Sequence, residues 1–169
     1  MATITLITGG QRSGKSSYAQ KLAKEYSENP VFLATAKIWD DDFKNRIERH
    51  KSDRDHTWQT LEENKNISKF NLKNKTVVLD CITLWLTNFY VDNNYDITQT
   101  LSQAKSEWNN FIKQDFKLIV VSNELGMGIH SNNEIGRKFA DLQGWMNQYI
   151  ASMADNVYFM VAGIPLKIK

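Results

Sequence analysis

The chain has 169 residues, of which 41% are hydrophobic and 24% are charged, and its formal net charge is +2. This length and composition predict one folded domain, residues 1–169, with a sizeable core, and they exclude a disordered chain. The near-balanced charge and the lack of a long apolar stretch predict neither a nucleic-acid partner nor a membrane span, and the single cysteine, Cys81, fits a reducing cytoplasm.

Short apolar runs alternate with helix-like stretches along the chain. The runs are nearly continuous, which is typical of strands buried on both faces of a parallel sheet, and the stretches between them carry apolar residues three or four apart. This alternation predicts an α/β fold with helices on both faces of a mostly parallel sheet. The predicted strands are 3–8, 31–36, 76–81, 118–123 and 157–163, and the predicted helices are 15–27, 41–54, 96–113 and 132–153.

The first predicted strand runs directly into TGGQRSGKS, residues 8–16. The spacing Gly9-x-x-x-x-Gly14-Lys15-Ser16 is the phosphate-binding loop signature, in which glycines let backbone N–H groups turn inward and the next helix adds its positive end. Lys15 is expected to reach the β- and γ-phosphates, and the Ser16 hydroxyl is expected to bind Mg²⁺. The strand-loop-helix context favours nucleotide binding over a chance glycine turn.

Two acidic residues follow predicted strands, where ligands of a parallel sheet bind. Asp80 ends the run KTVVLD and is interpreted as a second Mg²⁺ ligand, direct or through water, although a strand-ending Asp also serves as a cap. Glu124 follows LIVVSN, and a role in positioning a substrate hydroxyl or water stays open beside a plain capping role.

A charged stretch, RIERHKSDR at 46–54, places Arg46, His50 and Arg54 four residues apart, so that a helix would carry them on one face. Neighbouring cations oppose protonation of His50, and a neutral imidazole is a nucleophile that accepts a phosphoryl or nucleotidyl group. The alternative is a solvated helix surface with an incidental histidine, and the spacing by itself favours this alternative.

Several segments together resemble the bifunctional adenosylcobinamide kinase / adenosylcobinamide-phosphate guanylyltransferase family of cobalamin biosynthesis. The phosphate loop is shared by many families, whereas the combination of segments is much more specific and spans essentially the whole chain. The segments are ITGGQRSGKSSYAQKLA, LATAKIWDDDFKNRIERHK, VVLDCITLWLTN, VVSNELGMGI and DNVYFMVAGIPLKIK.

The resemblance implies two reactions. ATP or GTP phosphorylates adenosylcobinamide, and GMP then passes from GTP through a histidine of the protein to adenosylcobinamide phosphate, which gives adenosyl-GDP-cobinamide. The guanylylated histidine of the family falls on His50, which reverses the preference drawn from spacing. The resemblance also implies a three-layer P-loop NTPase (RecA-like) fold, a homotrimer with active sites near the subunit contacts, and Mg²⁺ with GTP and ATP as substrates.

The same resemblance assigns the nucleotide-binding residues. They form four groups: the phosphate loop, the end of the second strand, the segment after the histidine, and two acids. These residues are Gly10, Gln11, Arg12, Ser13, Gly14, Lys15 and Ser16; Ala34, Thr35 and Ala36; Lys51, Ser52, Asp53 and Arg54; and Glu62 and Asp80.

Two other functions stay open at this point. A small-metabolite kinase would use the phosphate loop without any protein adduct, and a nucleotide-sensing module would bind GTP or ATP without transfer chemistry. The apolar stretch 84–91 is a candidate wall for a large ring, although core or oligomer contact is the better interpretation, and the polar stretch 63–75 is expected to be a surface connection.

Overall fold

The computed structural model describes residues 1–37 and 54–169. The predicted helix 41–54 therefore lies, except for Arg54, outside the described residues. Strands are β1 (Thr3–Gly9), β2 (Val31–Ala34), β3 (Gln59–Glu62), β4 (Thr76–Asp80), β5 (Lys117–Val121), β6 (Asn156–Val161) and β7 (Ile164–Lys167). Helices are α1 (Lys15–Tyr26), α3 (Ile82–Asp92), α4 (Ile97–Phe111) and α5 (Glu134–Met153), with a short 3₁₀ turn, η1, at Ile67–Lys69.

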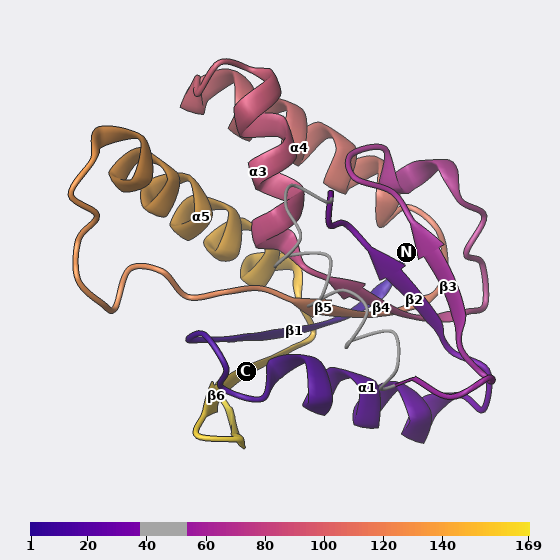
Figure 1. The fold of residues 1–169 in the computed structure, drawn as a ribbon. Coiled ribbons are helices and arrows are strands. Elements are labelled where there is room, and N and C mark those ends of the chain that lie inside the picture. Colours follow the sequence, from indigo (N-terminus) through magenta and orange to yellow (C-terminus); the bar gives the residue numbers. More distant parts are fainter. Residues whose placement is uncertain (38–53) are drawn as a thin grey trace.

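The strands form one sheet in the order β3-β2-β4-β5-β1-β6-β7. Every neighbouring pair is parallel except β6 and β7, which form an antiparallel hairpin at one edge. Helix α1 covers one face of the sheet and α3, α4 and α5 cover the other, which makes three layers (Figure 1). The predicted α/β class with a mostly parallel central sheet is confirmed.

Apolar side chains fill both spaces between the sheet and its helices. The larger cluster lies on the face covered by α3, α4 and α5, and includes the fully buried Trp85, Trp108 and Phe111. The smaller cluster lies under α1 and includes Ile7, Ala19 and Val78. Burial on both faces explains why the central strands read as continuous apolar runs rather than as alternating ones. No helix within the described ranges is long and apolar enough to cross a membrane.

The stretch 84–91 is core rather than the wall of a ligand site, because α3 buries Trp85, Leu86 and Tyr90 in the larger cluster. The expected surface connection 63–75 is only partly that, since it buries Ile67 and Leu72 completely or nearly so. These two apolar side chains fasten an otherwise polar segment to the core.

The sheet has two short strands that the apolar runs do not predict, β3 and β7. Within residues 1–37 and 54–169, strand β3 pairs with β2 alone and β7 with β6 alone, so both lie at edges of the described sheet. The β3 residues QTLE are largely exposed, and β7 (IPLK) is exposed throughout. Edge strands with little burial lack the hydrophobic pattern on which sequence interpretation depends.

The junction of β1 with the following loop is held closely by neighbouring strands. The N–H of Glu124 donates to the carbonyl of Gly9 at 3.0 Å, and the N–H of Gly163 donates to the carbonyl of Ser13 at 3.0 Å. A Cβ on Gly9 would lie 2.7 Å from the carbonyl oxygen of Met160 on β6, and the φ of Gly9 is 150°. Glycine is therefore required here because the β6 backbone leaves no room for a side chain.

We expect Gly9→Ala to lower the free energy of unfolding by about 1–3 kcal/mol, because its Cβ collides with backbone rather than with a flexible side chain. Gly10→Ala is the matched control, since nothing lies within 4 Å of a Cβ at that position. Urea unfolding followed by tryptophan fluorescence measures both variants. Equal stabilities for the two variants would contradict the steric argument.

Candidate active site

The phosphate loop connects β1 to α1 at the carboxyl end of the sheet. Its backbone uses the left-handed region at Arg12 (φ 55°) and Gly14 (φ 92°), and Gly14 caps the helix that begins with Lys15. No acidic residue lies in the first turn of α1. The first turn of α1 therefore carries no side-chain charge that offsets the positive end of the helix dipole, which suits an anion. The predicted residues Gly10, Gln11, Arg12, Ser13, Gly14, Lys15 and Ser16 come together here.

Lys15 is folded back into this loop. Its side chain is 7% exposed, and its ammonium donates to the carbonyl oxygen of Gly10 at 2.5 Å. Burial lowers the pKa of Lys15, and nearby Cys81 and Asp80 partly offset that effect. Burial also raises the pKa of Cys81 to about 12, so the thiol is protonated at neutral pH and Asp80 supplies the compensating charge. The loop thus holds a partly desolvated cation at the position where phosphates would bind.

Ser16 and Asp80 could hold a metal ion at this edge. Ser16 lies in the first turn of α1, and Asp80 ends β4, the strand against which α1 packs. A hydroxyl and a carboxylate are oxygen donors of the kind that Mg²⁺ takes, together with waters and substrate phosphates. The described residues contain no group of three His, Cys, Asp or Glu side chains suited to a metal. The Ser16 hydroxyl and the Asp80 carboxylate therefore fit Mg²⁺ as two of its oxygen ligands.

The predicted contacts at the end of β2 divide into two kinds. Ala34 and Ala36 are half-buried, whereas Thr35 between them is completely buried. The Thr35 hydroxyl donates to the carbonyl of Cys81 at 2.8 Å and accepts from the N–H of Cys81 at 2.9 Å. Its side chain therefore binds the protein, and it has no surface to offer a nucleotide.

A cavity of about 330 Å³ brings Arg54 and Glu62 together, two residues that the resemblance implicates in nucleotide binding. Trp58 and Thr60 also line it, because alternate residues of an extended chain face the same side. The guanidinium carbon of Arg54 lies 3.8 Å from the ring centroid of Phe32, which itself packs edge-on against Trp58. Among the described residues, the cavity thus combines the aromatic ring of Trp58 with the Arg54 cation and the carboxylates of Asp55 and Glu62.

Asp55 also lines this cavity and carries a stable negative charge. Hydrogen bonds from the Thr57 hydroxyl and N–H, together with Lys24, lower the pKa of Asp55 to about 2. Lys24 lies 3.1 Å from the carboxylate and 5.9 Å from the Trp58 ring centroid. Sequence reasoning missed Trp58 and Thr60, although the alternation Trp58-x-Thr60-x-Glu62 was the signal that could have revealed them.

The predicted nucleophile and its neighbours cannot be placed. His50, Lys51, Ser52 and Asp53 lie outside the described residues. The described chain stops at Lys37, just after the end of β2 at the carboxyl edge of the sheet, and resumes at Arg54 in the cavity described above.

Glu124 acts as a cap in this structure. Its carboxylate accepts from the N–H of Gly126 at 2.5 Å and so closes a turn after β5. Its backbone N–H donates to the carbonyl of Gly9 and so holds the junction between β1 and the phosphate loop. Of the two interpretations left open for Glu124, the observed contacts correspond to the capping role.

Comparison with known proteins gives a consistent result over nearly the whole chain. Residues 5–168 match the family model described as "Cobinamide kinase / cobinamide phosphate guanyltransferase". The "Bifunctional adenosylcobalamin biosynthesis protein CobU" of Escherichia coli is 35% identical, over 97% of this chain and 98% of that protein. The "Bifunctional adenosylcobalamin biosynthesis protein CobP" of Pseudomonas aeruginosa is also 35% identical, over 97% of this chain and 96% of that protein.

Among solved structures, the flagellar accessory protein FlaH from Methanocaldococcus jannaschii covers 99% of this chain, and the alignment covers 78% of FlaH. The TM-score is 0.43 at 11% identity, which is too low to carry an argument. The sequence matches do carry one, because they extend across the phosphate loop, the strand that ends in Asp80 and the C-terminal hairpin. On this ground the chain belongs to the cobinamide kinase / cobinamide phosphate guanyltransferase family.

Proposed function

We propose that this chain phosphorylates adenosylcobinamide with ATP or GTP and then transfers GMP from GTP to adenosylcobinamide phosphate, with adenosyl-GDP-cobinamide as the product. The observation that carries the proposal is the phosphate loop closed on Lys15 in a chain that belongs to this family over residues 5–168. The cytoplasm, which supplies both nucleoside triphosphates, is part of the same proposal.

In the kinase step the chain mainly positions and neutralises phosphates. Loop N–H groups and the α1 dipole bind the triphosphate, and the Lys15 ammonium exchanges its bond to Gly10 for phosphate oxygens. Ser16 and Asp80 would hold Mg²⁺, which neutralises charge on the phosphates when bound. The acceptor hydroxyl then forms an O–P bond to the γ-phosphorus while the bond to the nucleoside diphosphate breaks.

In the transfer step we assign the nucleophile to His50 by family resemblance. A neutral imidazole nitrogen forms a bond to the α-phosphorus of GTP, and pyrophosphate leaves. The phosphate of the phosphorylated cobinamide then attacks the same phosphorus, and the imidazole leaves. The predicted contacts Lys51, Ser52 and Asp53 belong to the same proposal.

We place the guanine base in the cavity lined by Arg54, Trp58 and Glu62. A carboxylate accepts two hydrogen bonds from the N1–H and N2–H groups of guanine, and adenine presents no donor at N1. Trp58 and the Arg54 guanidinium offer flat surfaces against which a base can stack. Glu62 would then discriminate GTP from ATP in the transfer step.

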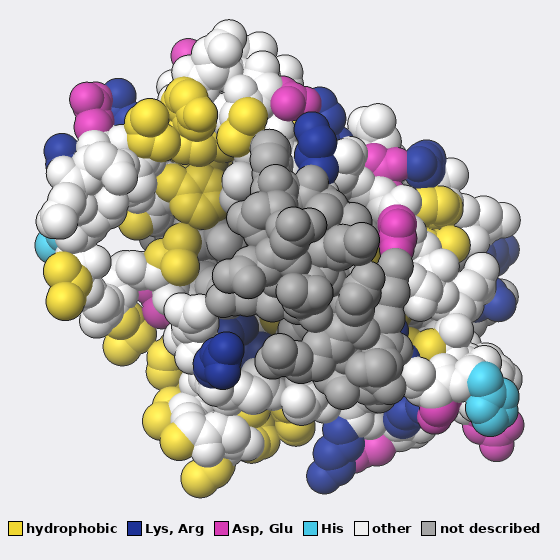
Figure 2. Space-filling view, viewed as in Figure 1, with side chains coloured by type: hydrophobic (Ala, Val, Ile, Leu, Met, Phe, Trp, Pro, Cys, Tyr) yellow, Lys and Arg dark blue, Asp and Glu magenta, His cyan; other side chains and the backbone are white. Residues whose placement is uncertain are grey.

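We also propose a homotrimer. Four apolar residues of the C-terminal hairpin are more than half exposed: Val161, Ile164, Leu166 and Ile168. Figure 2 shows hydrophobic side chains gathered at this corner, at the lower left of the molecule. An exposed apolar strand with an unpaired edge is a surface that proteins ordinarily cover, and a neighbouring copy of the chain would cover it here.

A kinase without guanylyl transfer is the second candidate. It is favoured by the phosphate loop and the Asp80 carboxylate, both of which phosphoryl transfer uses. The two candidates differ in whether a protein adduct forms.

Incubation with GTP labelled at the α-phosphate tests for the adduct. We expect acid-labile, base-stable label on the wild type, because a phosphoramidate bond has that stability, and no label on His50→Ala, which lacks the proposed nucleophile. His56→Ala is the matched control, since His56 is an exposed histidine six residues away, and it should label normally. Equal labelling of wild type and His50→Ala would rule out His50 as the nucleophile.

Glu62→Gln tests the base site. We expect it to weaken GTP binding by about 10–100-fold and ATP binding by little, because one bidentate base contact is worth roughly 1–3 kcal/mol. Glu134→Gln, which removes an exposed carboxylate from the start of α5, is the control. Calorimetric titration of each variant gives both dissociation constants. An unchanged ratio of GTP to ATP affinity would place the base elsewhere.

Leu166→Asp tests the subunit contact. We expect sedimentation equilibrium of the wild type to give about three times the chain mass of 19.5 kDa, and the variant to give the mass of one chain, because a buried charge opposes the contact. Tyr26→Ser, an exposed residue at the end of α1, should leave the assembly unchanged. A trimeric Leu166→Asp protein would exclude the hairpin as the interface.

A further inference from the structure

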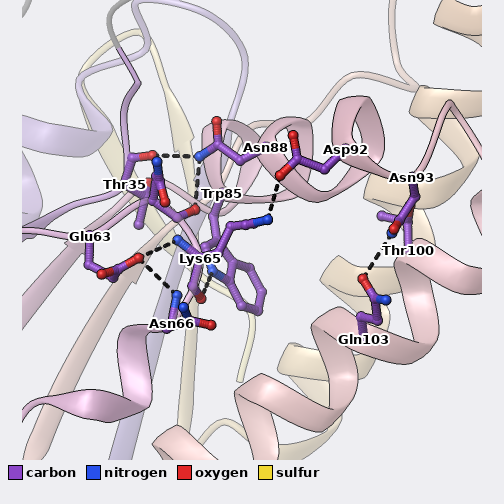
Figure 3. A network of polar contacts seen from close by, with 11 residues as sticks. Thr35, Glu63, Lys65, Asn66, Trp85, Asn88, Asp92, Asn93, Thr100 and Gln103 are labelled. Atoms are coloured by element: carbon purple, nitrogen blue, oxygen red, sulfur yellow. Dashed lines mark hydrogen bonds and ion pairs between the residues drawn. The ribbon is translucent and has the colours of Figure 1, made fainter.

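The carboxyl ends of β2, β3 and β4 are tied together by two buried polar side chains, Thr35 and Asn88. Figure 3 shows Asn88 on α3 beside Thr35, which directly follows β2. Thr35 is 0% exposed and Asn88 is 4% exposed, although both are polar. Neither side chain can reach a ligand directly, so their contacts with the backbone decide what they do.

Thr35 holds the end of β4 by hydrogen bonds. Its hydroxyl donates to the carbonyl of Cys81 and accepts from the N–H of the same residue, at 2.8 Å and 2.9 Å. Its own N–H donates to the carbonyl of Asp80 at 3.2 Å. Two consecutive residues of β4 and the following turn are therefore held to the end of β2, and the first of them is the proposed metal ligand.

Asn88 holds Thr35 in turn. Its side-chain N–H₂ donates to the carbonyls of Thr35 at 2.9 Å and Asn64 at 2.8 Å, which joins the turns after β2 and β3. Its buried Oδ1 has no hydrogen-bond partner among the residues that the structure describes, and in Figure 3 it points away from both carbonyls. An unpaired buried acceptor costs about 1–3 kcal/mol, so stability by itself is a poor reason for an amide among apolar neighbours.

Further hydrogen bonds hold the turn that contains Asn64, the second acceptor of the Asn88 amide. The Glu63 carboxylate accepts from the N–H groups of Lys65 and Asn66 at 2.9 Å and 3.0 Å. The indole N–H of the buried Trp85 donates to the carbonyl of Lys65 at 2.9 Å. The Asn64 carbonyl between them is consequently fixed relative to α3, and the Asn88 amide links it to the Thr35 carbonyl (Figure 3).

We propose that Thr35 and Asn88 are positioning residues for the Asp80 carboxylate: Thr35 holds the backbone of Asp80 through its N–H and the backbone of the next residue, Cys81, through its hydroxyl, and Asn88 fixes Thr35. The same contacts set the course of Ala34 and Ala36, the half-buried residues assigned to nucleotide binding. The inference rests on the proposed function for the role of Asp80, and on the observed hydrogen bonds for the rest.

The experiment compares Thr35→Val, which keeps the shape and removes the hydroxyl, with Thr35→Ser, which keeps the hydroxyl. Thr100→Val is the matched control, because Thr100 is also 0% exposed but lies on α4, where its hydroxyl accepts from Asn93. Manganese binding is followed by electron paramagnetic resonance in the presence of a non-hydrolysable GTP analogue. Thermal unfolding and binding of the analogue in EDTA are measured for each variant.

We expect Thr35→Val to weaken manganese binding by about 10-fold or more, since groups that orient a metal ligand typically contribute 10–100-fold to affinity. Thr35→Ser should stay within about twofold of the wild type, and Thr100→Val should lose stability without any change in manganese affinity. Unchanged manganese affinity in a folded Thr35→Val protein would overturn the proposal.

Should Thr35→Val fail to fold, Asn88→Ala provides the second test, because it leaves the Thr35 hydroxyl in place and releases the carbonyls of Thr35 and Asn64. A weakening in the same direction is expected there, and wild-type manganese affinity would overturn the proposal. The binding measurement needs no turnover. If the variants change manganese affinity as expected but the wild type neither phosphorylates nor guanylylates cobinamide, the proposed function is refuted and the positioning role is not.

Discussion

The buried ammonium of Lys15 is the constraint on which the rest of the site depends. A cation with 7% exposure needs acceptors, and the loop supplies one from its own backbone at Gly10, while the nearby Asp80 supplies compensating charge. At the start of the loop, Gly9 lies against the β6 backbone, where a Cβ would be 2.7 Å from the carbonyl oxygen of Met160. An anion that enters the loop replaces a backbone dipole with full negative charges, so the unliganded arrangement already favours phosphate.

The sheet order explains how Asp80 comes to lie near this cation. Strand β1 carries the loop and β4 carries the acid, and β5 lies between them in the sheet. Because all three strands are parallel, their carboxyl ends meet at the same edge, and α1 crosses from the loop over β4. The cation and the acid thus belong to different strands but to one edge, and the Thr35–Asn88 contacts fix the acid from the far side.

The cavity at β3 lies at an edge strand of the sheet. Its wall includes Trp58, which precedes β3, and Arg54, and both of these side chains pack against the ring of Phe32 on β2. The strand itself has little burial and depends on β2 for its hydrogen bonds. An edge strand is well suited to such a pocket, because one side of it is free of further strands.

The sequence by itself determined the features whose physics is local: the phosphate loop, whose glycines, lysine and helix are contiguous, and the central strands, which burial on both faces makes continuously apolar. Only the tertiary structure decided those features in which a residue's neighbours are distant in the chain. It buried Thr35, predicted as a nucleotide contact, against Cys81, it used Glu124 as a cap, and it formed the edge strands β3 and β7. The reason is that hydrogen bonds between remote segments leave no periodic pattern in sequence, whereas burial and backbone turns do.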